Sequence, residues 1–205
     1  MAAGIRTPEW HTATATATDP GAALLACGST VEPSTLSAII RVESGDRPLA
    51  INVNGVENQP RQAATAAEAT SIAQSWITRG YSVDLGWMQV NSRNLASLNF
   101  TVAQMFDPCT NIMAGASILT ADYLSAMGSR PNPQDALRAA LSAYNTGDFE
   151  RGFYNGYVAK YYGPSAGGGN MPTIAAVAYQ PRHTRAPSSP FTASPDVYSR
   201  EATNE

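Results

Sequence analysis

Two consecutive amphipathic helices expected between residues 107 and 147 constrain the fold most strongly. Asp107 and Pro108 form a capping and first-turn signal. Apolar side chains then recur every three or four residues as far as Gly128: Ile112, Ala116, Leu119 and Tyr123. Asn132 and Pro133 open a second helix, whose apolar stripe consists of Ala136, Leu137, Ala140, Leu141 and Tyr144. This spacing places each set on one helix face and predicts a mainly α fold.

Other stretches extend the helical pattern. Ser34 occupies an N-cap position before Leu36, Ile39 and Ile40, and Gly45 provides a stop signal. An Ala-rich helix is expected over residues 61–79, and two smaller helices near 92–98 and 101–106. Residues 81–90 alternate only loosely and predict an extended segment or a small hairpin. The expected fold class is therefore mainly α, a single domain with at most a little β structure.

The two ends of the chain differ from this central part. Residues 1–26 show neither helical nor strand periodicity, and residues 164–205 are rich in Pro, Gly and Ser. Such segments bury too little apolar surface to offset their ordering entropy, so both are expected to be disordered. The folded domain is expected at residues 27–163. No secretory signal is evident in residues 1–27, and the route of export stays open.

Charge and cysteine content narrow the function classes. The formal net charge is −3 and only 14% of residues are charged, which excludes a basic surface for nucleic acid or a polybasic membrane patch. No apolar run is long enough to span a bilayer. The two cysteines, Cys27 and Cys109, are too few for a disulfide scaffold or a zinc site. A single structural disulfide or two unrelated buried thiols both fit the count.

Glu43 is the first candidate for chemistry. It follows Leu36 by seven residues and Ile40 by three, so it shares the apolar face of its helix. Burial disfavours the charged form of a carboxyl, and this is how an enzyme keeps a carboxylic acid protonated near neutral pH. The helix alone leaves a second explanation open, a partly buried Glu that pairs with Arg41 or Arg47.

Two further clusters carry polar and aromatic groups. Residues 86–89 combine a backbone that can approach a ligand closely with apolar surface and a side-chain amide: Gly86, Trp87, Met88 and Gln89. Tyr144 ends the stripe of its helix and precedes Asn145, and its hydroxyl is a candidate partner for Glu43. Considered singly, these clusters are better explained by a core-packed turn and a core tyrosine.

Taken together, the three clusters resemble a known family. Glu43-Ser44, residues 86–89 and residues 143–145 (Ala-Tyr-Asn) are similar, in order and spacing, to the Glu-Ser, Gly-Leu-Met-Gln and Ala-Tyr-Asn signature of soluble lytic transglycosylases, which have a goose-lysozyme-like catalytic domain. Residues 48–55, 83–86, 107–112, 140–147 and 155–158 extend the likeness to the transglycosylase subunit of VirB-type type IV secretion and conjugation systems. Trp87 departs from the pattern, since that family usually has Leu there.

The resemblance implies a fold and an activity. The fold would be lysozyme-like, and the enzyme would be a periplasmic lyase that cleaves peptidoglycan between N-acetylmuramic acid and N-acetylglucosamine and leaves a 1,6-anhydro ring. Glu43 would be the catalytic acid and base, with no metal or organic cofactor. Support would come from Ser44 and Tyr144, and substrate binding from Gly86, Trp87, Met88, Gln89 and Asn145. The family also implies a disulfide between Cys27 and Cys109.

Other functions remain open at this point. Asp84 precedes the 86–89 cluster, and an Asp holding a water opposite Glu43 would make the enzyme an inverting muramidase. A different class of function is a non-catalytic assembly factor that binds peptidoglycan. In either case residues 164–205 are candidates for contacts with secretion components.

Overall fold

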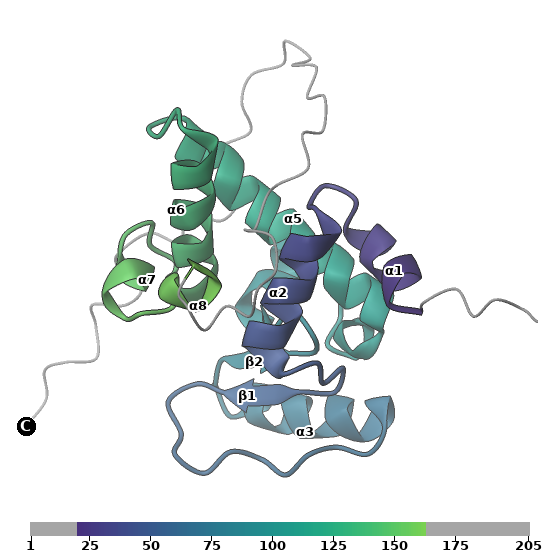
Figure 1. Cartoon of the computed structure of the whole chain (residues 1–205). Coiled ribbons are helices and arrows are strands. Elements are labelled where there is room, and N and C mark those ends of the chain that lie inside the picture. The colour runs from purple at the N-terminus through teal and green to yellow at the C-terminus, as the bar shows by residue number, and fades with distance from the viewer. Residues whose placement is uncertain (1–19, 163–205) are drawn as a thin grey trace, which may run out of the picture.

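The computed structural model describes residues 20–162 (Figure 1). The remaining parts of the two expected disordered ends, together with Gly163, lie outside the described residues. The helices are α1 (Pro20–Leu25), α2 (Pro33–Ser44), α3 (Ala66–Thr78), α4 (Leu95–Leu98), α5 (Pro108–Met127), α6 (Pro133–Thr146), α7 (Arg151–Tyr154) and α8 (Ala159–Tyr162). Short 3-10 helices are η1 (Ala26–Gly28), η2 (Ser92–Asn94) and η3 (Ala103–Phe106), and the strands are β1 (Ile51–Val53), β2 (Val83–Leu85) and β3 (Val90–Asn91).

Helix α5 runs through the centre of the described part and packs along α6 (Figure 1). Asp107 caps it, because its carboxylate accepts from the Thr110 backbone N–H at 2.8 Å, and Pro108 fills the first turn. The α5 side chains predicted to be apolar and inward, Ile112, Ala116 and Leu119, are buried. The mainly α fold and this central helix are therefore confirmed.

Helix α6 begins and ends as its sequence predicts. The Asn132 side chain accepts from the backbone N–H groups of Gln134 and Asp135, and Gly147 ends the helix in a left-handed conformation, with φ of 70°. At the far end of the helix pair, three alanines are fully buried where α5 and α6 meet: Ala126, Ala136 and Ala139. Small side chains at this point allow the two helices to approach closely.

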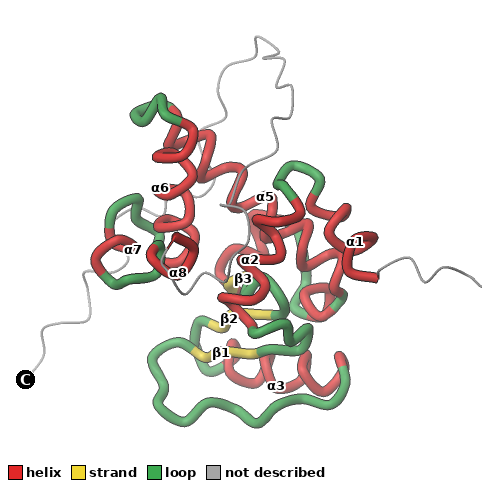
Figure 2. Tube along the Cα trace, in the orientation of Figure 1, coloured by secondary structure: helices red, strands yellow, loops and turns green. Residues whose placement is uncertain are grey.

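The expected hairpin in residues 81–90 is present and belongs to a three-stranded antiparallel sheet, in the order β1-β2-β3. Strand β1 was not predicted from the sequence, because three residues are too few to show a clear alternation. One face of the sheet is apolar and turned to the core, through Val53, Val83, Leu85 and Val90. Figure 2 shows the strands between the C-terminal end of α2 and helix α3.

Several helix starts differ from the expectation. Helix α2 begins at Pro33 with Glu32 at the N-cap, so Ser34 lies inside the helix. Helix α3 begins at Ala66 rather than near residue 61, because Thr65 caps it and the Glu68 carboxylate accepts from the Ala64 N–H at 2.7 Å.

Helix α1 lies within the segment 1–26, for which the sequence predicts no regular structure. Its Leu24 and Leu25 pack against the core. A disulfide joins Cys27, in η1, to Cys109, in the first turn of α5, with a Cα–Cα distance of 5.4 Å. The start of the described chain is thereby attached to the central helix. No helix in residues 20–162 is long and apolar enough to cross a membrane.

Candidate active site

Glu43 lies in the last turn of α2, where Gly45 ends the helix with a φ of 60°. The face of α2 that carries Glu43 also carries Leu36 and Ile39, which are fully buried. Burial raises the pKa of the Glu43 carboxyl from its usual 4.5 to about 7. A nearby hydroxyl and the ammonium of Lys160 lower this pKa, and the charge of Asp84 raises it, all by less than burial does. The position predicted from the helical spacing therefore holds a carboxyl that loses its proton near neutral pH rather than near pH 4.5.

The hydroxyl on Glu43 belongs to Tyr157, which donates a hydrogen bond to Oε1 of the carboxyl. The Tyr157 hydroxyl also lies 2.7 Å from that of Tyr161, one helical turn further along. The two rings pack edge to face with centroids 5.4 Å apart, and both side chains are buried. Sequence reasoning did not single out either tyrosine as a partner of Glu43. Their i, i+4 spacing beside Lys160 was the available signal.

The expected hydrogen bond from Tyr144 to Glu43 is wrong. Tyr144, near the end of α6, donates to the backbone carbonyl of Met88 at 2.6 Å instead. Ser44 does not hold the carboxyl either, since its hydroxyl donates to the Ile40 carbonyl, one turn back in α2, at 2.9 Å. Both residues support the site through the backbone: Ser44 at the end of α2, and Tyr144 by fixing residues 86–89 against α6.

Residues 86–89 form a tight turn between β2 and β3. Gly86 has a φ of 72°, a conformation that favours glycine, and its N–H donates to the Ala50 carbonyl at 2.9 Å. The Gln89 side-chain amide donates to the Gly86 carbonyl at 2.8 Å, which closes the turn. Gln89 itself has a φ of 47°. The predicted cluster is thus a rigid piece of backbone attached to the residue that precedes β1.

Met88 is fully buried, so its side chain does not face a substrate as predicted. It packs on Gly115 of α5, where a Cβ atom would lie 2.6 Å from the Cβ of Met88. Trp87 is half-buried against the core, and among the described residues its indole Nε1 has no hydrogen-bond partner. Asn145 is exposed, and its Oδ1 accepts from Asn155 Nδ2 at 3.2 Å. Trp87 and Asn145 thus keep the exposure that a substrate contact needs.

A residue that the sequence reasoning missed, Asn111, forms a hydrogen bond with the 86–89 turn. Asn111 of α5 is buried, and its Oδ1 accepts from the Met88 N–H at 2.7 Å. Its Nδ2 donates to the carbonyls of Leu85 and Met105, at 2.8 and 3.0 Å. A buried amide with both ends satisfied fixes the relative positions of β2, η3 and α5.

Asp84 lies in the middle of β2, and three Asn side chains surround its carboxylate. Asn52 and Asn54 donate to Oδ2 at 3.1 and 3.0 Å, and Asn91 donates to Oδ1 at 2.6 Å. Burial raises the pKa of Asp84 above its usual range, and these three hydrogen bonds lower it by less than burial raises it.

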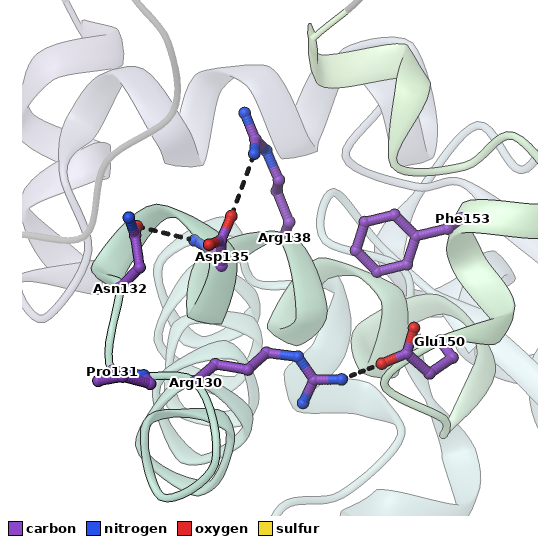
Figure 3. A pocket seen from close by; sticks show the side chains of 7 residues that line it. All are labelled: Arg130, Pro131, Asn132, Asp135, Arg138, Glu150 and Phe153. Carbon is purple, nitrogen blue, oxygen red and sulfur yellow. Dashed lines mark hydrogen bonds and ion pairs between the residues drawn. The ribbon is translucent and has the colours of Figure 1, made fainter.

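Two other features of residues 20–162 concern ligands. No group of His, Cys, Asp and Glu there has the arrangement of a metal site. A surface pocket lies at the N-terminal end of α6, where Arg130 meets Glu150 and Arg138 meets Asp135 (Figure 3). None of the predicted site residues lines this pocket.

Comparison with known proteins gives a family and several relatives. The family described as "Transglycosylase SLT domain" matches residues 24–162. "Protein virB1" of Agrobacterium fabrum (strain C58) is 40% identical over 134 residues, covering 65% of this chain and 54% of that protein. "Type IV secretion system protein virB1" of Brucella abortus biovar 1 is 44% identical over 128 residues, covering 62% and 53%. The chain thus spans about half the length of these relatives. No solved structure matches the chain.

Proposed function

Because the chain belongs to the transglycosylase SLT domain family, we propose that it is a peptidoglycan lytic transglycosylase with Glu43 as its single acid and base. The observation that carries the proposal is the Glu43 carboxyl itself, which is half-buried at a helix end, accepts a hydrogen bond from one tyrosine, and has a pKa of about 7. A group that must first give a proton and then take one works best when its pKa lies near the operating pH.

The proposed reaction needs no second nucleophile. Protonated Glu43 gives its proton to the glycosidic oxygen as the bond from C1 of N-acetylmuramic acid to that oxygen breaks. The C6 oxygen of the same sugar then bonds to C1, and its proton passes to the Glu43 carboxylate. The acid is thereby regenerated, the sugar ends in a 1,6-anhydro ring, and no water is consumed. The Tyr157 hydroxyl can donate to Glu43 in both protonation states, which keeps the carboxyl in place between the two steps.

The other site residues divide into two groups in this proposal. Trp87, Gln89 and Asn145 contribute to substrate binding, since Trp87 and Gln89 are partly exposed and Asn145 is exposed. Gly86, Met88, Ser44 and Tyr144 act as support, because their contacts are with backbone or core. Trp87 offers an indole face where a sugar ring could stack.

The biological setting is part of the same proposal. The names of the matched relatives point to type IV secretion, so the enzyme would open the cell wall locally for a secretion or conjugation apparatus in the periplasm. The Cys27–Cys109 disulfide suits such an oxidising compartment. We propose that the folded unit ends near residue 163 and that residues 164–205 contact secretion components. A pull-down with residues 164–205 deleted tests that contact.

The product decides the reaction type. Purified sacculi are digested with wild-type protein and with Glu43→Gln, and the released muropeptides are weighed by mass spectrometry. The proposal expects anhydro-muropeptides, one water lighter than hydrolysis products and without a reducing end, from the wild type alone. Reducing-end muropeptides would identify a muramidase instead. Sacculi that bind the wild-type protein but release nothing would identify a peptidoglycan-binding assembly factor.

A further inference from the structure

The polar face of the small sheet carries a row of three side chains. Asn52 of β1 and Asn91 of β3 are the direct cross-strand neighbours of Asp84. Because side chains alternate along a strand, all three lie on the face opposite to the buried Val53 and Val83. Each strand of the sheet therefore contributes one polar group to a single line that crosses Asp84.

This row holds Asp84 as a carboxylate. A carboxylate is an acceptor only, and the Asp84 oxygens accept from three amide N–H groups, one on Oδ1 and two on Oδ2. Hydrogen bonds to the charged form of a carboxyl favour that form. All three donors are neutral, and no Lys or Arg in residues 20–162 forms an ion pair with Asp84. Its negative charge is therefore fixed in place but not cancelled.

The charge of Asp84 acts on Glu43. The segment that follows the last turn of α2 is attached to the end of β2, because the Ala50 carbonyl accepts from the Gly86 N–H at 2.9 Å. The two carboxyls interact electrostatically, and the charge of Asp84 raises the pKa of Glu43. Lys160 of α8 acts in the opposite direction. The titratable and charged groups that face Glu43 from the elements around it are Asp84 from β2, Tyr144 from α6, and Tyr157, Lys160 and Tyr161 from the C-terminal end.

We propose that Asp84 is a positioning residue for the reaction proposed above: it is a carboxylate held by Asn52, Asn54 and Asn91, whose negative charge keeps the proton on Glu43 until the glycosidic oxygen takes it. The same repulsion favours return of a proton from the C6 hydroxyl to Glu43, because two neighbouring carboxylates are less stable than one. Three amide N–H groups occupy acceptor positions on the Asp84 carboxylate, one on Oδ1 and two on Oδ2. The catalytic role of Asp84 rests on the proposed function, whereas its effect on the ionisation of Glu43 does not.

The direct test measures the pH at which Asp84 and Glu43 ionise rather than enzymatic activity. With 13C-labelled Asp and Glu carboxyls, NMR titration of the full chain should show Asp84 ionising at a lower pH than Glu43. Asp84→Asn should lower the pH at which Glu43 ionises by about 0.5 unit or more. Asp84→Glu, which retains the charge on the same strand, is the matched control and should leave Glu43 closer to its wild-type value. If Glu43 ionises at a lower pH than Asp84 in the wild type, the inference is overturned. This comparison uses the wild-type protein alone, so it does not depend on whether a variant folds.

A second readout uses the product. Release of anhydro-muropeptides by the wild type should fall as the pH rises through about 7, where Glu43 loses its proton. In Asp84→Asn this upper limit should move to lower pH, with the anhydro product unchanged. An unshifted limit would refute the role of the charge. A change of product to reducing ends would refute the proposed function, while the NMR titration would still report on Asp84 separately.

Discussion

Replacing Glu43 by Gln should stabilise the protein above pH 7 while abolishing its activity. The native state holds the Glu43 proton more tightly than the unfolded chain does, because burial raises the pKa of the folded carboxyl to about 7. Below pH 4.5 both states carry the proton and the residue has no pH-dependent effect. Between pH 4.5 and 7 the unfolded chain ionises first, so the free energy of unfolding falls as the pH rises.

The size of the effect follows from the same shift. The pKa rises from 4.5 to about 7, and at about 1.4 kcal/mol per unit the wild type loses at most roughly 3 kcal/mol above pH 7. Gln has nearly the same shape, does not ionise, and still accepts a hydrogen bond from Tyr157. The variant should therefore match the wild type at pH 4 and exceed it by up to about 3 kcal/mol at pH 8.

Urea denaturation of both proteins at pH 4, 6 and 8 measures this difference. Glu57→Gln, at an exposed position, is the matched control, and a surface substitution of this kind changes stability by no more than about 0.5 kcal/mol. Release of muropeptides by Glu43→Gln should fall by about 10³-fold or more, because both proton transfers are lost. A variant that is less stable than the wild type at pH 8, or a gain that is equal at all three pH values, would refute the reasoning.

Three further changes give distinct outcomes. Tyr157→Phe removes a bond that favours charged Glu43, so the pKa of Glu43 should rise, the upper pH limit of activity should move upward, and activity should fall roughly 10–100-fold; an unchanged pH profile would exclude this role. Burial raises the pKa of Asp122 to about 7, and Asp122→Asn should therefore stabilise the protein above pH 7 by roughly 2 kcal/mol, about half of the full conversion because the side chain stays partly exposed. Urea titrations at pH 4 and 8 measure this, and equal gains at both would count against it. Reducing the Cys27–Cys109 bridge, which spans a separation of 82 residues, should lower the free energy of unfolding by at most about 4.5 kcal/mol; identical thermal melts with and without reductant would contradict it.

The helices were predictable where local signals agreed. Asp107-Pro108 and Asn132-Pro133 combine a capping side chain with a residue that suits only the first turn, and the apolar spacing after each one gives the buried face. The same periodicity placed Glu43 on the inner face of α2. These are short-range relations, which a single sequence contains in full.

The contacts between distant residues were not predictable in this way. Tyr157 is 114 residues from Glu43, and Asn111 is 23 residues from Met88. Tyr144 was assigned to Glu43 because it matches a motif, yet α6 directs its hydroxyl to the Met88 carbonyl. Met88 was assigned to substrate binding by resemblance, because nothing local shows that Gly115 leaves space for it in the core. Which groups meet depends on how the helices pack, and periodicity says only which face is inward.

The sequence separation between Glu43 and Tyr157 also determines at what stage of folding the site is complete. The acid lies on the second helix of the described chain, and its only hydrogen-bonding side chain in residues 20–162 lies between α7 and α8, at the opposite end. A molecule that stops short of residue 157, or whose last turns have not yet docked, lacks the Tyr157 hydrogen bond that positions the Glu43 carboxyl. On the proposed mechanism we expect such unfinished or half-folded copies to leave peptidoglycan intact, and activity to begin only when the last segment of the domain is in place.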